Sequence, residues 1–579
     1  MQGSICAPLI VAIAVLAFLG MSFRKGGIKQ RLNLGKSASS DSAAADSHVE
    51  TFARKKIKSG KFSAADVNDL CGDAKSSEKN ASRNLLRRMN ASATFPEVYV
   101  APIVAWDAVN ACKTEVDAHF LLPYEVLDHV GSAEWASLDA SEHSVSVARK
   151  SWGERLNPPM DDTSEIVPLS LWGDSAPLSK KNGSLYMLLW SVLRVSFSKR
   201  FWIVCFSKDL LCQCGCAGRC TIDSALRVVV WACQVMLAGV WPAFRDDGTA
   251  FAASTRQGDV ARAKRAGSRL KVRGAMLAKK GDWAWLKQVV NLASWSSSSR
   301  CCWLCRANHD NMTDATGAAE WRQTMVSNLE FQQEQEGSYR SVLWGLPGFI
   351  LAYIDLDLMR VADLGISQAL VGNCIFELFK ELGGVQAHPD KTLGELLTLI
   401  SIASKHLGFD RPINGLTLLM FKQPGKTPRM RTKAAETRHL VVVVDWLFTE
   451  MFQPKNPHAV LRQRCVKQLA LFYEELRIWG PGSPQRAAVL GRTHVILYAE
   501  LLREALASGD WENSSWHPWR FYPKHHLFVH LAEVGIARAG NPKAFWCYQD
   551  ENAIGEAVKI GKACHCKYVH RSIIDKYRL

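Results

Sequence analysis

The chain has 579 residues, of which 48% are hydrophobic and 22% are charged, and its formal net charge is +16. These proportions are those of a globular protein, and they exclude a mostly disordered chain, a collagen and a long coiled coil. A basic balance of this size favours a polyanionic partner, either nucleic acid or an acidic membrane surface.

The N-terminal segment contains an apolar run without charge over residues 5–23, followed closely by Arg24, Lys25, Lys29 and Arg31. A helix of this length reaches about 28 Å, close to the thickness of a bilayer core. The sequence therefore predicts a single apolar helix over residues 1–24, a possible membrane anchor with the bulk of the chain on the cytoplasmic side. The alternatives are a cleaved signal peptide, or an N-terminal segment that gene prediction has joined to the chain in error. The second alternative predicts a nuclear protein. Small polar residues predict a disordered linker over 25–50, and helix-forming residues predict a helical region over 51–160.

The central region begins with three short hydrophobic runs, over residues 166–171, 185–195 and 201–206. Short connections between buried strands indicate an antiparallel meander in a mixed sheet. A long apolar helix is expected next, capped by Thr221 or Asp223 and running to about residue 240. Residues 274–278 then form a short strand or a helix, because they lack the β-branched residues typical of strands.

Two aspartates follow strand-like runs, Asp174 after the first run and Asp282 after residues 274–278. An acid on a first strand, two more strands, a helix and a strand ending in a second acid is the order found in RNase H-like nucleases and transposases. Such enzymes use carboxylates to bridge two divalent metals about 4 Å apart. Because hard oxygen ligands suit Mg²⁺ or Mn²⁺, we expect one of these ions at the two aspartates.

A basic segment separates the long helix from Asp282. Residues 256–280 carry nine Lys or Arg and one Asp, a local charge of +8. Such a segment is suited to the phosphate backbone of DNA. The predicted nucleic-acid contacts are Arg262, Lys264, Arg265, Arg269, Lys271 and Arg273.

Two cysteine clusters predict structural zinc. Cys302 and Cys305 have the spacing that places two thiolates on one tetrahedral ion, and His309 follows four residues later. The segment LCQCGCAGRC supplies a tighter set. The predicted zinc ligands are Cys212, Cys214, Cys216, Cys220, Cys302, Cys305 and His309. His526 and His530 also share a helix face, with a spacing suited to metal or phosphate, but the residues alone favour the alternative of a partly exposed helix face.

The ordered segments PLSLWGD, CQCGC, GVWPAF, KKGDWAWL and SWSSSSRCCWLCRAN, followed by YPKHHLFVHLAE and GNPKAFWCYQDENAIGEAV, resemble transposases of eukaryotic DNA transposons. The similarity is to the Kyakuja–Dileera–Zisupton and Plavaka-like groups, and it covers roughly residues 165–575. It implies an RNase H-like domain with Cys-rich insertions, in which Asp174 and Asp282 are the first two catalytic acids. Glu551, with its neighbour Asp550, would supply the third, and Asp357 and Asp363 are its rivals. The chain has Arg360 where the family pattern has His.

The expected fold is therefore α/β, with an RNase H-like mixed sheet and Cys-rich insertion over residues 161–390, and a helical part over 391–579 that completes the core. The expected function is metal-dependent DNA phosphodiester hydrolysis and strand transfer by Asp174, Asp282 and Glu551. The first alternative is an inactive descendant that still binds DNA, which the Arg360 departure favours. The second is a membrane-anchored, zinc-stabilised interaction protein without catalysis, whose positive charge binds an acidic lipid surface.

Overall fold

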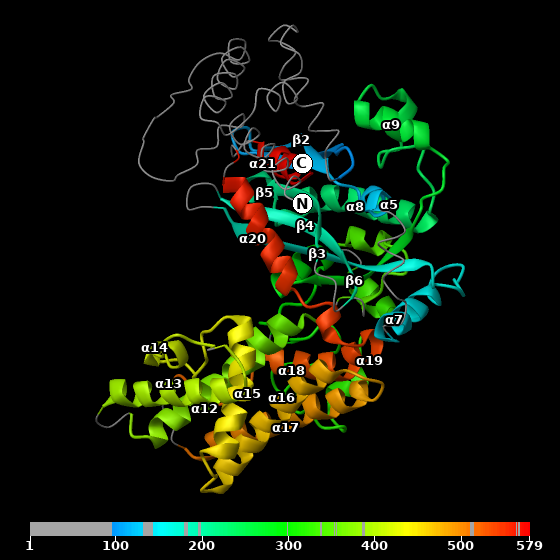
Figure 1. The fold of residues 1–579 in the computed structure, drawn as a ribbon. Coiled ribbons are helices and arrows are strands. Elements are labelled where there is room, and N and C mark those ends of the chain that lie inside the picture. The colour runs from blue at the N-terminus through cyan, green and yellow to red at the C-terminus, as the bar shows by residue number, and fades with distance from the viewer. Residues whose placement is uncertain are drawn as a thin grey trace, which may run out of the picture.

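The computed structural model describes residues 95–130, 143–178, 183–194, 199–297, 299–335, 339–351, 354, 356–384, 388–410, 412–509, 514–562, 564 and 568–578. The predicted N-terminal anchor and the linker lie outside these residues. The described part combines a mixed sheet in one half with a mostly helical second half, which confirms the mixed α/β class and the helical C-terminal part (Figure 1).

The central sheet has four strands in the order β5-β4-β3-β6. Its strands are β3 (Ile166–Pro177), β4 (Ser184–Val192), β5 (Phe201–Ser207) and β6 (Arg273–Gly281). The first three are antiparallel neighbours, and β6 pairs with β3 in parallel. A parallel neighbour requires a crossover connection, which here contains helix α8 (Arg219–Ala238). The three predicted strands are confirmed, and the ambiguous segment at 274–278 is a strand.

The sheet lies deep in the molecule, because every residue of β5 and nearly every residue of β4 and β6 is buried. Helix α8 contacts β6, whereas α20 (Tyr548–Lys562) contacts β3 and β4 and crosses the strands in Figure 1. Neither predicted cap of α8 is correct, since the helix begins after Gly218. Thr221 is buried and donates to the Leu210 carbonyl, while Asp223 accepts from the Tyr339 hydroxyl.

The prediction of a helical region over 51–160 is wrong for residues 99–120. They form an antiparallel hairpin of β1 (Tyr99–Asp107) and β2 (Cys112–Phe120), in which alternate residues of β1 are buried. This two-residue period allows one face of the hairpin to pack on α8. Helices α5 (Pro123–Val130) and α7 (His143–Gly153) follow.

The second half consists of helices inserted between β6 and α20, and they form the lower part of Figure 1. They confirm the predicted helical part over residues 391–579. The helices are α12 (Ser367–Glu381), α13 (Pro389–His406), α14 (Leu418–Phe421), α15 (Ala434–Glu450), α16 (Pro457–Ile478), α17 (Ser483–Ala507), α18 (Pro523–His530) and α19 (Ile536–Ala539). Two π-helical stretches, η6 (Met359–Ile366) and η7 (Leu531–Gly535), precede α12 and follow α18.

Shorter elements complete the described chain. They are α9 (Gln257–Arg265), α10 (Trp283–Val290), α11 (Asn328–Glu334) and α21 (Val569–Arg578), with 3₁₀ turns η1 (Lys208–Leu210), η2 (Phe251–Ala253), η3 (Glu320–Thr324), η4 (Val342–Gly345) and η8 (Pro542–Ala544). Helix α21 returns to pack on β5 and β2.

Two described helical segments, Arg219–Ala238 and Met359–Glu381, are long and apolar enough to cross a membrane. The apolar windows of these segments are 61% and 89% buried inside the protein. Core helices of a folded domain have the same length and composition, so these two segments are accounted for by internal packing.

Candidate active site and metal centres

The first two predicted acids lie at the same end of neighbouring strands. Gly173 of β3 is paired with Gly281 of β6. The next residues along the two strands, Asp174 and Asp282, therefore lie side by side. Asp282 is also the N-cap of α10 and accepts a hydrogen bond from the Trp285 amide at 2.6 Å. A capping carboxylate bonded through one oxygen keeps its second oxygen for another partner.

Glu551 reaches this position from α20. The Arg360 guanidinium in η6 donates from the same nitrogen, Nη2, to Asp174 at 2.7 Å and to Glu551. Asp282 also acts electrostatically on Asp174 and on Glu551, raising the pKa of both carboxyls after the larger effect of burial. The three predicted acids are therefore gathered around one side chain, which we call the acidic centre.

Burial and the neighbouring Asp282 raise the pKa of Asp174 to about 6, although Arg360 opposes this shift. Several carboxylates that share one partly buried site repel each other, and a cation lowers the cost of charging them. In this structure the cation is Arg360. π-Helical turns are common at functional sites, and here such a turn presents Arg360 to the carboxylates.

The two rival acids differ from each other. Asp357 is buried near Arg360, with 3.9 Å between its Oδ2 and the Arg360 Nε, and this Oδ2 has no hydrogen-bond partner among the described residues. Asp363 is held by the hydroxyls of Tyr473 and Tyr548, each at 2.6 Å. Asp357 thus belongs to the acidic centre, whereas Asp363 is bonded within the helical half.

Asp550, the neighbour of Glu551, has a structural role. Its fully buried carboxylate pairs with Lys280 of β6 at 2.8 Å and with Arg200 at 2.6 Å. A buried carboxylate with two cationic partners is well compensated. This network fixes α20 against the sheet and thereby places Glu551 at the acidic centre.

The first metal-ligand group differs from its prediction. Cys302 and Cys305 meet His526 and His530 of α18, and the four buried donor atoms lie within 4.8 Å of one another. His309, predicted as their partner, is instead exposed at the surface. The signal for the correct pair was present in the sequence as the four-residue spacing of the two histidines. Nothing in the sequence joined it to cysteines more than 200 positions away.

The separations in this Cys2His2 group are close to, and slightly shorter than, those around a tetrahedral zinc ion. The Cys305 Sγ lies 3.2 Å from the His526 Nε2 and 3.4 Å from the His530 Nε2, and the two Nε2 atoms are 3.1 Å apart. Bond lengths of about 2.0 to 2.3 Å to zinc give tetrahedral edges of about 3.3 to 3.8 Å. Hydrogen bonding from Cys302 lowers the pKa of Cys305, and burial lowers the pKa of His526, so thiolate and neutral imidazole are favoured.

The second group consists of Cys212, Cys214, Cys216 and Cys220, as predicted, and its sulfurs also lie within 4.8 Å of one another. The Sγ atoms of Cys214 and Cys220 are 3.8 Å apart. Hydrogen bonds from Cys212 and Cys216 lower the pKa of Cys214 to about 6. Both groups are thus arranged so that they could hold a metal ion such as zinc.

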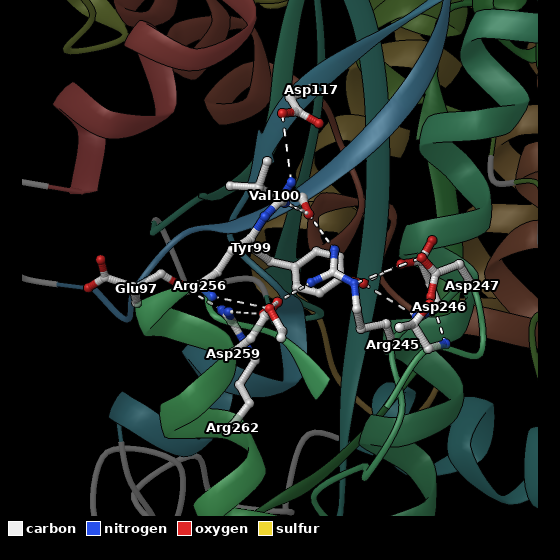
Figure 2. A network of polar contacts seen from close by, with 12 residues as sticks. Glu97, Tyr99, Val100, Asp117, Arg245, Asp246, Asp247, Arg256, Asp259 and Arg262 are labelled. Carbon is white, nitrogen blue, oxygen red and sulfur yellow. Dashed lines mark hydrogen bonds and ion pairs between the residues drawn. The ribbon is translucent and has the colours of Figure 1, made fainter. Parts of the chain in front are cut away.

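The predicted DNA contacts separate into buried and exposed residues. Arg262 is buried against Glu125, with contacts of 2.6 and 2.9 Å, and it also bonds the Glu97 carbonyl at 2.8 Å. In Figure 2 the Arg262 and Arg245 side chains lie near the Tyr99 ring, and both guanidinium groups bind Asp259. The proposal of Arg262 as a phosphate ligand is therefore not compatible with its surroundings.

Two further members of the set are occupied in part. Arg265 pairs with Asp128 at 2.6 Å, and Arg273 donates to the Leu237 carbonyl at 3.0 Å. Lys264, Arg269 and Lys271 are exposed. Of the predicted set, these three and the half-exposed Arg265 remain accessible to a phosphate.

No protein-family model matches this chain, and no curated protein matches it in sequence.

Proposed function

We propose that this chain is an RNase H-like, transposase-like protein that hydrolyses and transfers DNA phosphodiesters with Mg²⁺ or Mn²⁺ at Asp174, Asp282 and Glu551. The observation that carries the proposal is the meeting of Asp174 and Glu551, which are far apart in the sequence, at one Arg360 nitrogen. The strand order supports it, because a meander, a crossover helix and a parallel fourth strand bring two acids to one sheet edge.

The donor set suits hard divalent cations. Asp174, Asp282, Asp357 and Glu551 offer only oxygen ligands, and their charge exceeds that of the single Arg360. When bound, two such ions would polarise the scissile phosphate and activate the attacking water or hydroxyl. In the protein, Asp282 is oriented by its bond from the Trp285 amide, and Glu551 by the anchoring of α20 through Asp550.

The test is Mn²⁺-dependent nicking of supercoiled plasmid DNA. We expect Asp174→Asn, Asp282→Asn and Glu551→Gln each to reduce nicking by at least about a hundredfold, since each removes a ligand charge. Asp445→Asn is the matched control, because Asp445 lies on α15, pairs with Lys467 at 3.3 Å and should leave nicking unchanged. Nicking that persists in Asp174→Asn would contradict the proposal.

Arg360 favours a second candidate, a protein that binds DNA without cleaving it. Its guanidinium lies between two carboxylates that a divalent ion would also need. Arg360→Gln removes this charge, and we expect Mn²⁺ affinity measured by calorimetry to rise by about tenfold, or about 1.4 kcal/mol. A wild-type protein that never nicks DNA, together with tight Mn²⁺ binding by Arg360→Gln, would establish the inactive alternative.

We further propose zinc as the ion in both cysteine groups. The soft sulfur donors and neutral imidazoles exclude Mg²⁺ as their preferred ion. Metal analysis of the purified chain should give two equivalents of zinc, falling to one in Cys305→Ser. Cys374→Ser, at a buried cysteine outside both groups, should retain two. Less than one equivalent in the wild type would contradict the assignment.

A further inference from the structure

A basic pocket of about 260 Å³ lies in the helical half, between the loop that follows α14 and the segment that precedes α18. Four cationic side chains line it, Lys426, Arg429, Arg431 and Arg520, and no carboxylate among the described residues does. Among the described residues none of the four forms an ion pair, in contrast to the buried arginines of the α9 segment. Unpaired cations around one hollow create a positive potential that attracts anions.

The loop that carries three of these cations is held in place by its own backbone. The Arg429 amide donates to the Phe421 carbonyl at 2.8 Å, and the Arg431 amide to the Met420 carbonyl at 2.7 Å. The Thr427 hydroxyl donates to the His517 carbonyl at 3.0 Å, which joins the loop to the opposite wall. The pocket is thus preformed rather than assembled by a ligand.

Aromatic rings form part of the same walls. Trp516 lies 3.5 Å below the Lys422 ammonium, and Tyr522 has the guanidinium groups of Arg429 and Arg520 at 5.8 and 5.9 Å from its ring. A phosphate alone would not stack on the aromatic rings, and an apolar ligand would not neutralise the cations. A nucleotide in a single strand has both an anionic backbone and a flat base that stacks on aromatic side chains.

The pocket adjoins the element that presents Arg360 to the acidic centre. The Arg429 guanidinium donates to the Leu364 carbonyl of η6 at 2.6 Å, and Lys524, two residues after Tyr522, donates to the Arg360 carbonyl at 2.7 Å. One strand could therefore contact the pocket and the acidic centre on either side of η6.

We propose that the basic pocket binds an unpaired nucleotide of a DNA strand, with its phosphate on Arg431 and its neighbours and its base on Trp516 or Tyr522. Because the pocket lies beside the acidic centre, this binding would hold a DNA strand near the carboxylates, a role that rests on the proposed function. Binding itself requires neither metal nor cleavage, so the two claims can be tested separately.

The experiment measures fluorescence anisotropy of a labelled oligothymidylate with the full chain in EDTA at fixed salt. We expect Arg431→Gln to weaken binding by about threefold to tenfold and Trp516→Leu by about fivefold or more. Arg464→Gln, at an exposed arginine on α16, is the matched charge control and should bind like the wild type. A fully paired duplex should show no loss from Trp516→Leu.

Wild-type affinity in both pocket variants would overturn the proposal. Loss in Arg431→Gln alone would also overturn it, because it would leave only a general phosphate contact without stacking. If the expected losses occur in EDTA but the wild type fails to nick DNA with Mn²⁺, the pocket stands and the proposed catalysis fails. If neither pocket variant loses affinity but the wild type nicks DNA in a manner that depends on Asp174, the proposed catalysis stands and the pocket proposal fails.

Discussion

Gly173 leaves no room for a side chain beside the acidic centre. A Cβ at this position would lie 2.3 Å from the Trp285 ring, which donates its Nε1 to the Tyr186 hydroxyl at 2.5 Å. The close contact between backbone and indole fixes the strand end from which Asp174 projects. A glycine is therefore required here for packing rather than for an unusual backbone angle.

Gly173→Ala should lower the free energy of unfolding by about 1–3 kcal/mol, because Trp285 or the strand must move. Chemical denaturation measures the change. Gly555→Ala in α20 is the matched control, since a Cβ there meets nothing within 4 Å. That substitution should raise stability by about 0.5–1 kcal/mol, as alanine does within a helix. Equal stability of Gly173→Ala and the wild type would show that the indole yields without cost.

At the scale of elements, His458 joins three helices. It is at the beginning of α16, and its ring nitrogens lie 2.7 Å from Glu504 of α17 and 3.1 Å from Glu377 of α12. The hydrogen bond to Glu377 is the main cause that raises the pKa of His458 above its ordinary value of 6.5. A raised histidine pKa means that the folded state binds the proton more tightly than the unfolded state.

The resulting stabilisation is complete below pH 6.5 and disappears as the pH rises through the higher pKa of the folded state. We expect His458→Gln to be less stable than the wild type by roughly 0.5 kcal/mol at pH 6, a small value because the side chain is partly exposed. The difference should shrink as the pH rises through the raised pKa of the folded state. His309→Gln, at an exposed histidine that pairs with no carboxylate in the described chain, should show no such trend. A difference that grows with pH would contradict the assignment.

At the scale of the whole molecule, buried arginines join segments that are distant in sequence. Arg262 of α9 connects Glu125 of α5 with the Glu97 carbonyl before β1, and Arg578 of α21 contacts Glu97 at 2.8 Å. The two ends of the described chain are thus linked to each other beside the sheet. Arg262, Lys279 and Lys280 of the basic segment are buried, so part of its positive charge serves internal contacts.

Arg262→Met should cost about 3–5 kcal/mol of unfolding free energy, because it leaves Glu125 and Asp259 buried with less compensation. Lys264→Met, two positions further along the same helix but exposed, should change stability by less than about 0.5 kcal/mol. Thermal and denaturant unfolding of the two variants provide the comparison. A similar small effect in both would indicate that Arg262 is replaceable by packing.

The sequence by itself determined the local features of this protein: the three strands of the meander, the long apolar helix, and two aspartates at strand ends. Strand hydrophobicity and chain order suffice for these, because each depends on neighbours a few residues away. The sequence was less informative for residues 99–120 and for the caps of α8, where competing local signals pointed elsewhere.

The tertiary structure alone decided which distant groups meet. Arg360 lies between Asp174 and Glu551, His526 and His530 replace His309 beside Cys305, and Arg262 is buried instead of facing a ligand. Each outcome depends on how the inserted helices pack on the sheet. The charge and spacing of residues along the chain do not predict that packing. For this reason the composition suggested an exposed basic surface where the fold contains internal ion pairs.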